Sequence, residues 1–179
     1  MRWIKFGILS IVGIIVLATA ALAIAGSGSD ANRLQCSLVI RQKPAAIWPW
    51  LYEAEKVKQW VTWIVEVRNE GPPVAGSKMV WVMEDRNNGN ARMEITAVAQ
   101  TVEPERKLAV ALSATEAFRG TSTYTLTVEP DGSTVLASDS RYTFDNGFAK
   151  FMMPLVIWQA KKKMLSDMGH LRTLIEAKP

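Results

Sequence analysis

Residues 152–171 read MMPLVIWQAKKKMLSDMGHL, a nearly unbroken apolar run followed by three lysines. From Met153 onward, apolar side chains recur at spacings of three and four residues, which is the period of one face of an α-helix. The members of this stripe are Met153, Ile157, Ala160, Met164, Met168, Leu171 and Ile175. Pro154 has no amide hydrogen to donate, so it fits such a helix only in the first turn. The sequence therefore predicts one long C-terminal helix whose apolar face is covered by the rest of the chain.

The residues before this helix alternate between apolar and polar side chains, which is the period of a β-strand. The clearest case is ARMEITAVAQ at residues 91–100. The segments predicted as strands are residues 34–42, 63–71, 78–85, 91–100, 106–114, 120–132 and 133–144. The residues expected on their inward faces are Leu34, Cys36, Leu38, Ile40, Met79, Trp81, Met83, Met93, Ile95, Ala97, Leu108, Val110, Leu112, Tyr124, Leu126 and Val128.

The phase of the last predicted strand is ambiguous. Asp139 and Arg141 fall on the same face as Val135 and Ala137, so the pattern does not separate charged from apolar residues. A β-bulge in this strand would shift the phase and turn one of the polar side chains inward. Both orientations therefore stay open at this stage.

The order of the elements predicts the fold class. Residues 44–61, PAAIWPWLYEAEKVKQWV, predict two short helices that are broken at Pro49 or in residues 52–55. They follow the first strand and precede the other six. Because the strands are grouped and the helices lie apart from them, we expect an α+β fold in which a curved antiparallel sheet wraps around the C-terminal helix.

The N-terminus carries a predicted membrane element. Residues 6–25, FGILSIVGIIVLATAALAIA, contain no charge and are long enough to span a bilayer as a helix. Arg2 and Lys5 precede this run, so the positive-inside rule places the N-terminus in the cytoplasm and the domain on the extracytoplasmic side, the periplasm in a bacterium. A cleaved signal peptide is the alternative, because AIA before Gly26 fits a cleavage site. We expect an anchor at 1–26, a linker at 27–33 and one domain at 34–179.

Charge and cysteine content exclude some classes of protein. The net charge of +4 is modest and both signs are interspersed, which does not favour nucleic-acid binding. Cys36 is the only cysteine, so no intramolecular disulfide forms, and it is expected in the core. His170 is the only histidine and is expected on the helix surface, so no cluster of imidazole ligands can form. The sequence predicts neither a metal nor a cofactor.

Several residues in order along the domain carry a resemblance to a known superfamily. They are Ile40, Pro44, Ile47, Trp48, Trp60, Pro154 at the start of the last helix, and GHLRTLIEA at 169–177. In this order they resemble the START-related SRPBCC superfamily, which includes polyketide cyclase/dehydrase-like and lipid-transfer proteins, over roughly residues 34–177. The resemblance implies a helix-grip fold with an elongated apolar cavity between the sheet and the last helix.

Within that implied fold, large apolar side chains are candidates for the cavity wall. Methionine adapts to irregular shapes and aromatic rings offer a large contact area, although packing in an ordinary core explains each residue equally well. The candidate ligand-binding residues are Trp60, Trp81, Met83, Met93, Tyr124, Phe148, Met152, Met153 and Ile157. They lead to the first hypothesis, a membrane-anchored domain that binds a small hydrophobic, lipid-like molecule.

Two other hypotheses remain. A cyclase or dehydrase would hold an apolar substrate in the same cavity and use polar groups such as Tyr124, Tyr142, Asp139 or Arg141. An interaction domain would contact a protein partner through the helix face and the loops at 86–90 and 103–107. The acidic residues of the central strands are expected on the surface, not in a catalytic pair: Glu84, Asp85 and Glu94.

Overall fold

The computed structural model describes residues 28, 30–69, 71–85, 91–115, 117–145 and 147–177, without the side chains at 69, 85 and 148–150. The predicted membrane segment at 6–25 lies outside these residues. In the part of the chain that is described, no helix is long and apolar enough to cross a bilayer.

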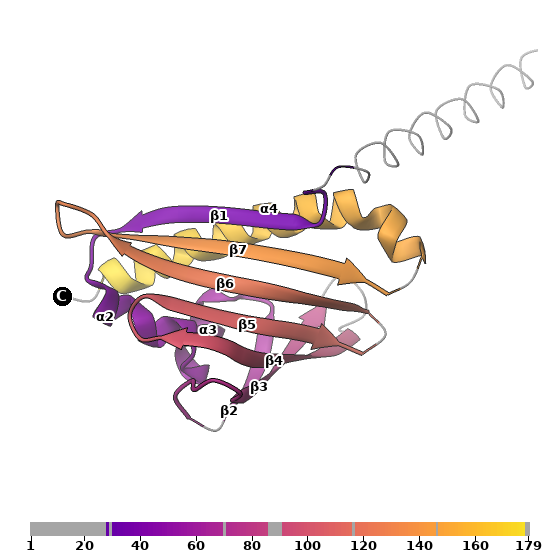
Figure 1. Ribbon diagram of the computed structural model, residues 1–179, viewed down its shortest axis with the longest axis horizontal. Coiled ribbons are helices and arrows are strands. Elements are labelled where there is room, and N and C mark those ends of the chain that lie inside the picture. Colours follow the sequence, from indigo (N-terminus) through magenta and orange to yellow (C-terminus); the bar gives the residue numbers. More distant parts are fainter. Residues whose placement is uncertain are drawn as a thin grey trace, which may run out of the picture.

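Among the residues that the structure describes, seven strands form one antiparallel sheet, as the alternation predicts. They are β1 (Arg33–Ile40), β2 (Ile64–Asn69), β3 (Lys78–Asp85), β4 (Ala91–Glu103), β5 (Lys107–Ala114), β6 (Phe118–Val128) and β7 (Thr134–Phe144). Their order in the sheet is β1-β7-β6-β5-β4-β3-β2, so the first strand pairs with the last and the others follow as a meander. The sheet curves around the helices in Figure 1.

The helices of the described residues occupy two positions in the chain. Between β1 and β2 lie α2 (Pro44–Ile47), the 3-10 helix η1 (Trp48–Leu51) and α3 (Ala54–Trp60), and the chain ends with α4 (Gly147–Glu176). The chain breaks at both expected places, because Pro49 begins the 3-10 turn and residues 52–53 separate it from α3. The α+β class is confirmed.

The C-terminal half of α4 closes the core against β1 and β7, while α3 packs on β2. In α4, Met168, Leu171 and Ile175 are each at most 3% exposed, which confirms the later part of the predicted stripe. Figure 1 shows α4 lying behind β1, with α2 and α3 beside it on the same side of the sheet. All described strands of the sheet and all residues of the buried apolar cluster lie, in sequence, between the start of β1 and the end of α4.

Two predictions about element ends are wrong. The helix α4 begins at Gly147, so Pro154 lies inside it and not in the first turn. An interior proline removes the helical hydrogen bond to the carbonyl of residue 150 and its ring crowds that carbonyl, at a cost of about 3 kcal/mol. Val128 was expected inward but is 59% exposed, because it ends β6 beyond the part of the sheet that the helices cover.

The structure resolves the phase of β7, which the sequence left open, and shows no bulge in this strand. This strand pairs without a register shift with both β1 and β6, and the shifts occur instead between Ile64 and Glu66 and between Ala99 and Thr101. The buried residues of β7 are small and polar in three of four cases: Thr134, Leu136, Ser138 and Ser140. The charged residues point to the outer face, because buried hydroxyls can be hydrogen-bonded inside whereas isolated charges cannot.

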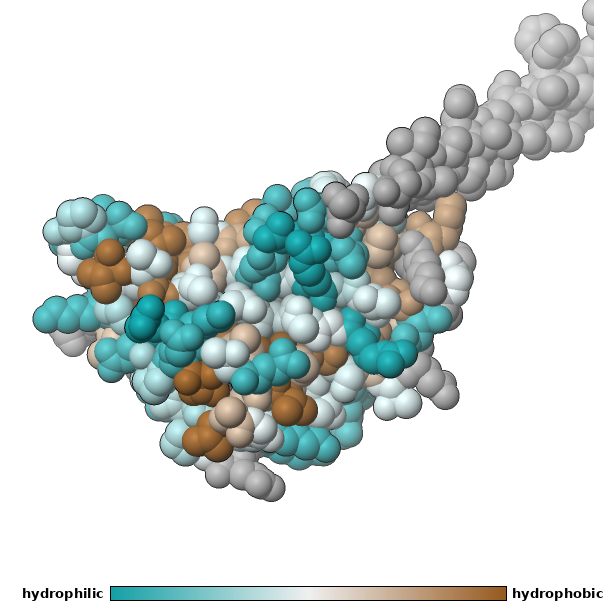
Figure 2. Space-filling view, viewed as in Figure 1, coloured by the Kyte–Doolittle hydropathy of each residue, from teal (hydrophilic) through white to brown (hydrophobic). Residues whose placement is uncertain are grey.

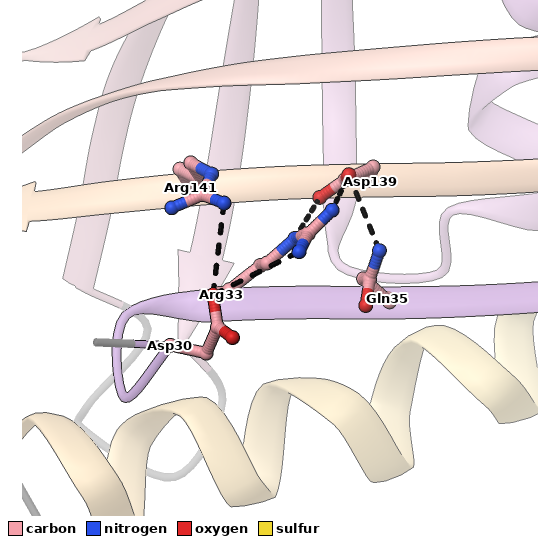
Figure 3. A network of polar contacts seen from close by, with 5 residues as sticks. All are labelled: Asp30, Arg33, Gln35, Asp139 and Arg141. Carbon is pink, nitrogen blue, oxygen red and sulfur yellow. Dashed lines mark hydrogen bonds and ion pairs between the residues drawn. The ribbon is translucent and has the colours of Figure 1, made fainter. Parts of the chain in front are cut away.

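Asp139 and Arg141 belong to a network of polar contacts on the outer face of the sheet. Arg33 Nε donates to Asp139 Oδ1 at 2.9 Å, and Gln35 Nε2 donates to Asp139 Oδ2 at 3.2 Å. Asp30 Oδ1 lies 3.6 Å from Arg141 Nη2 and 3.7 Å from Arg33 Nη1. Figure 3 shows this network joining β1 to β7, and Figure 2 shows hydrophilic side chains gathered over the same strands. These charged groups therefore stabilise the β1–β7 edge and do not enter the interior.

Candidate functional site

A cavity of about 480 Å³ lies between the concave face of the sheet and the helices α3 and α4. This volume falls within the range of about 300–1,000 Å³ that is usual for small-molecule sites. The cavity is lined by Leu34, Leu51, Val57, Trp60, Val61, Trp63, Ile64, Trp81, Met83, Met93, Ile95, Leu112, Ala117, Phe118, Ser122, Tyr124, Tyr142, Phe144, Val156, Ile157, Ala160, Met164 and Asp167.

The cavity exists because no helix in the described part of the chain lies directly on the middle of the sheet. The helix α4 packs mainly on β1 and β7, and α3 packs mainly on β2 and α4. The inward side chains of β3, β4 and β5 therefore meet the helices only across a space. Trp63 and Val156 line this space and are 38% and 41% exposed, so the opening to solvent lies near them.

Aromatic and sulfur-containing side chains make up much of the wall. Trp60 is buried, and its Nε1 donates to the carbonyl oxygen of Trp50 at 2.8 Å, which fixes the indole ring between η1 and the cavity. Trp81 and Met83 from β3 face Met93 from β4 across the paired strands. Such a wall offers dispersion contacts to an apolar guest and can adapt to its shape.

A cluster of hydroxyl groups interrupts this apolar wall where β6 and β7 pair. Ser122 lies opposite Ser140 in the register, and their Oγ atoms are hydrogen-bonded. Tyr124 lies opposite Ser138, whose buried Oγ has no hydrogen-bond partner among the described residues. Tyr142 completes the group, which we call the hydroxyl cluster: Ser122, Tyr124, Ser138, Ser140 and Tyr142.

Gly120 gives the Tyr142 ring its position. The two residues are partners in the β6–β7 register, and a Cβ at position 120 would lie 2.9 Å from Tyr142 Cδ1 and would clash with the carbonyl oxygen of Arg141. The absence of a side chain on β6 thus lets the ring lie across the strand, a device known from other sheets. Phe118 supports the ring from the other side at a centroid distance of 5.7 Å, edge to face.

Both tyrosines of the cluster are held in the protonated form. Burial raises the pKa of Tyr124 well above its usual value, and burial likewise raises the pKa of Tyr142. Hydrogen bonding with Ser122 acts in the opposite direction on both groups without cancelling the effect. The cluster can therefore donate hydrogen bonds to a neutral oxygen, but its tyrosines are poor general bases, which need a lowered pKa.

One carboxylate also lines the cavity, on the α4 side. Asp167 is buried, forms an ion pair with Lys163 one turn earlier and accepts a hydrogen bond from Thr62 Oγ1 at 3.2 Å. Thr62 follows α3, so this contact joins α3 to α4. Among the described residues no group of three or more His, Cys, Asp and Glu side chains gathers.

The structure places six of the nine predicted site residues on the cavity wall: Trp60, Trp81, Met83, Met93, Tyr124 and Ile157. Met152 and Met153 are half-buried but do not line the cavity, since the first turns of α4 extend past it. The side chain of Phe148 lies outside the described part of the chain. His170 is exposed on α4, as predicted, and Glu84 and Glu94 pair with arginines on the outer face.

Sequence reasoning named Tyr124 and Tyr142 but missed the three serines of the hydroxyl cluster and Asp167. The signal for Ser122 was present, because it lies two residues before Tyr124 and so shares its face. Asp167 lies three residues after Met164 and four before Leu171, beside the apolar stripe. Neither Ser122 nor Asp167 is predicted for the cavity from the sequence, because serine and aspartate are residue types that are expected on the surface.

A curved antiparallel sheet that holds a C-terminal helix over an apolar cavity defines an SRPBCC-type domain, and the comparisons agree with this class. The family model described as "Activator of Hsp90 ATPase homolog 1-like protein" matches residues 41–152, more than half of the chain. The chain belongs to this family. A comparison with curated protein sequences found no match.

Solved structures with the same fold share little sequence with the chain. The ZhuI aromatase/cyclase from Streptomyces sp. R1128 aligns with a TM-score of 0.65 at 8% identity, covering 80% of this chain and 93% of that one. A conserved protein from Geobacillus kaustophilus gives a TM-score of 0.67 at 10% identity, covering 81% and 95%. A protein from Rhodobacter sphaeroides gives 0.65 at 18% identity, covering 86% and 97%. At these identities the similarity is one of fold alone.

Proposed function

We propose that this domain binds one small, largely apolar molecule in the cavity and holds it by a neutral oxygen-bearing group at the hydroxyl cluster. The observation that supports this most strongly is the cavity itself, about 480 Å³ of space with an almost wholly apolar wall. An apolar space of this size gains free energy when a guest replaces water, at about 0.8 kcal/mol for each methylene buried. The predicted tether at residues 6–25 makes a lipid-like guest from a membrane the proposed ligand.

The chemistry of the cluster supports a neutral group over an anionic one. The two tyrosines keep their protons, and a carbonyl or hydroxyl oxygen of the guest can accept from them. Among the described residues that line the cavity there is no lysine or arginine, so a carboxylate or phosphate placed inside would have no opposite charge there. Esters, alcohols, ketones and quinones of modest size fit this description.

Extraction of the purified domain tests the proposal. Residues 28–179 contain the whole sheet and core, so this part is produced, purified without detergent and extracted with organic solvent for mass spectrometry. We expect a neutral apolar compound in near-stoichiometric amount, which is absent from the Ala160→Phe variant. An empty wild-type domain that also fails to take up the neutral probe N-phenyl-1-naphthylamine would refute the proposal.

The cyclase or dehydrase hypothesis has one specific observation in its favour, the Asp167 carboxylate on the cavity wall. Its other candidates, Asp139 and Arg141, lie on the outer face, and Tyr124 is held protonated. If the extracted compound is converted by the wild-type domain and not by Asp167→Asn, while both bind it equally, the domain is an enzyme. Equal recovery of unchanged compound from both supports a binding protein.

A further inference from the structure

The segment of α4 from Phe151 to Leu165 is apolar on two opposite faces. Its inner face carries Ile157, Ala160 and Met164, which line the cavity. Its outer face carries a second apolar stripe at spacings of four, three and seven residues, which we call the outer stripe: Phe151, Leu155, Trp158 and Leu165. These side chains are 36%, 37%, 54% and 48% exposed, respectively. The apolar stripe of a surface helix normally faces the core, so a second apolar stripe that faces solvent calls for a partner.

The C-terminal half of the same helix shows what an ordinary exposed face looks like. There the outward positions are Gly169, Thr173 and Glu176, while Met168, Leu171 and Ile175 are buried. The outer stripe is therefore confined to residues 151–165 of α4 and does not reflect the composition of the whole helix. Val156, which lies on another face of the helix than the stripe, is exposed and also lines the cavity.

Charge and chain connectivity indicate which partner covers the stripe. Lys161 and Lys162 are exposed beside it, and Lys162 Nζ lies 3.8 Å from the centre of the Trp158 ring. Tryptophan with lysine beside an apolar stripe is the composition of helices that lie in the interface of an anionic membrane.

The N-terminal chain reaches the same end of the molecule. Arg33 pairs with Arg141 near the end of β7, and α4 begins six residues after Arg141. The seven-residue linker at 27–33 can span at most about 25 Å, so a segment inserted at 6–25 would keep this end of the domain close to the bilayer.

We propose that the outer stripe docks onto the anionic surface of the bilayer in which residues 6–25 are inserted. This proposal rests on the tether of the proposed function and adds a second membrane contact to it. The lysines would contact anionic headgroups while Trp158 sits at the level of the headgroups.

Site-directed spin labelling of the full chain in lipid nanodiscs tests this proposal. Nitroxides are attached at Leu155→Cys in the outer stripe and, as a matched control, at Thr173→Cys, eighteen residues later on the same face of the helix. Native Cys36 does not interfere, because it is buried and burial raises the pKa of its thiol. The readout is the ratio of collisions with oxygen, which concentrates in lipid, to collisions with a water-soluble nickel chelate.

In nanodiscs of phosphatidylcholine with phosphatidylglycerol, we expect the label at 155 to be accessible to oxygen and shielded from nickel, and the label at 173 to be accessible to nickel. Replacing Lys161 and Lys162 by glutamine should lower the docked-to-free ratio about fivefold for each lysine, which corresponds to about 1 kcal/mol. The substitutions should have little effect in nanodiscs of phosphatidylcholine alone, where no anionic headgroup is present.

Equal nickel accessibility at 155 and 173, in chains that remain in the nanodisc, would overturn the docking proposal while leaving the tether intact. A label at 155 that is shielded from both reagents with either lipid would show that protein covers the stripe, from a second copy or the N-terminal segment, and would also overturn it. Loss of the full chain from the nanodiscs would refute the tether and the docking together. None of these results affects the cavity, which is tested separately by extraction of residues 28–179.

Discussion

Replacing Ala160 by phenylalanine should block the cavity without unfolding the domain. Ala160 lies on the cavity-facing side of α4, between Ile157 and Met164, and its side chain ends at the cavity wall. A phenyl ring at this position projects into a space that is already empty, so it need not displace its neighbours. Phenylalanine is also acceptable in a helix at a cost of less than about 0.7 kcal/mol.

The expected loss of affinity follows from the volume of the ring. The six added carbon atoms fill roughly 100–150 Å³, taking each at somewhat less than the ~30 Å³ that a water molecule occupies in the liquid. That is about a quarter of the 480 Å³ available. A guest that loses room for about five methylene groups loses about 4 kcal/mol, or nearly a thousandfold in affinity. The unfolding free energy should rise slightly, by about 1 kcal/mol, because the ring fills a void.

Fluorescence titration with N-phenyl-1-naphthylamine measures the affinity, and urea denaturation measures the stability. Gln159→Phe is the matched control, because it adds an aromatic ring one residue earlier on an exposed side of the same helix. We expect the control to bind the probe like the wild type. If Ala160→Phe binds as tightly as the wild type, or if both variants weaken binding equally, the probe does not enter this cavity and the reasoning is wrong.

Other substitutions test the hydroxyl cluster and the outer face. Ser138→Ala should stabilise the domain by about 1 kcal/mol in urea denaturation, because it removes a buried hydroxyl that lacks a partner, whereas Ser140→Ala should destabilise it by about as much, because it removes the buried hydrogen bond between Ser140 and Ser122; equal effects of the two would contradict this assignment. Gly120→Ala should lower the free energy of unfolding by about 1–3 kcal/mol, because the added Cβ clashes with β7, and unchanged stability would show that β6 and β7 move apart without cost. Arg33 holds the pKa of the Asp139 carboxyl below its usual value, so Asp139 stabilises the fold above its unfolded pKa of about 4 and loses this effect as the pH falls through its lower folded pKa. Asp139→Asn should therefore be less stable than the wild type at neutral pH, with a difference that disappears in acid; a constant difference at all pH values would refute the electrostatic explanation.

The fold could be predicted largely from the period of the apolar residues and from the order of the predicted elements along the chain. Alternation located all seven strands, because one face of each packs on the core and the other meets solvent. The stripe in α4 held from Met164 to Ile175, where the helix closes the core. The exceptions have a common cause: the start of α4, the end of β6 at Val128 and the phase of β7 depend on what another element covers, and local sequence does not contain that information.

The site was predictable in its large side chains, the two tyrosines of the hydroxyl cluster included. Trp81, Met83 and Met93 were found because large apolar residues on the inward face of a sheet line either the core or a cavity. The serines of the cluster were not found, because these small residues of β6 and β7 gain their role from each other across the strand pair. Met152 and Met153 were predicted to line the wall because they belong to the same apolar run as Ile157. In the structure both methionines lie in the first turns of α4, which extend past the cavity, and the helix lines the cavity only from Val156 onward.

The location of the guest can be measured directly by NMR of the methionine methyl groups. On addition of N-phenyl-1-naphthylamine to residues 28–179 labelled at the methionine methyls, the signals of Met83, Met93 and Met164 should shift together, because these three line the cavity. Those of Met152 and Met153 should stay in place. Shifts confined to Met152 and Met153, or no shift at any cavity methionine at saturating probe, would contradict the claim that the space between the sheet and α4 receives a ligand.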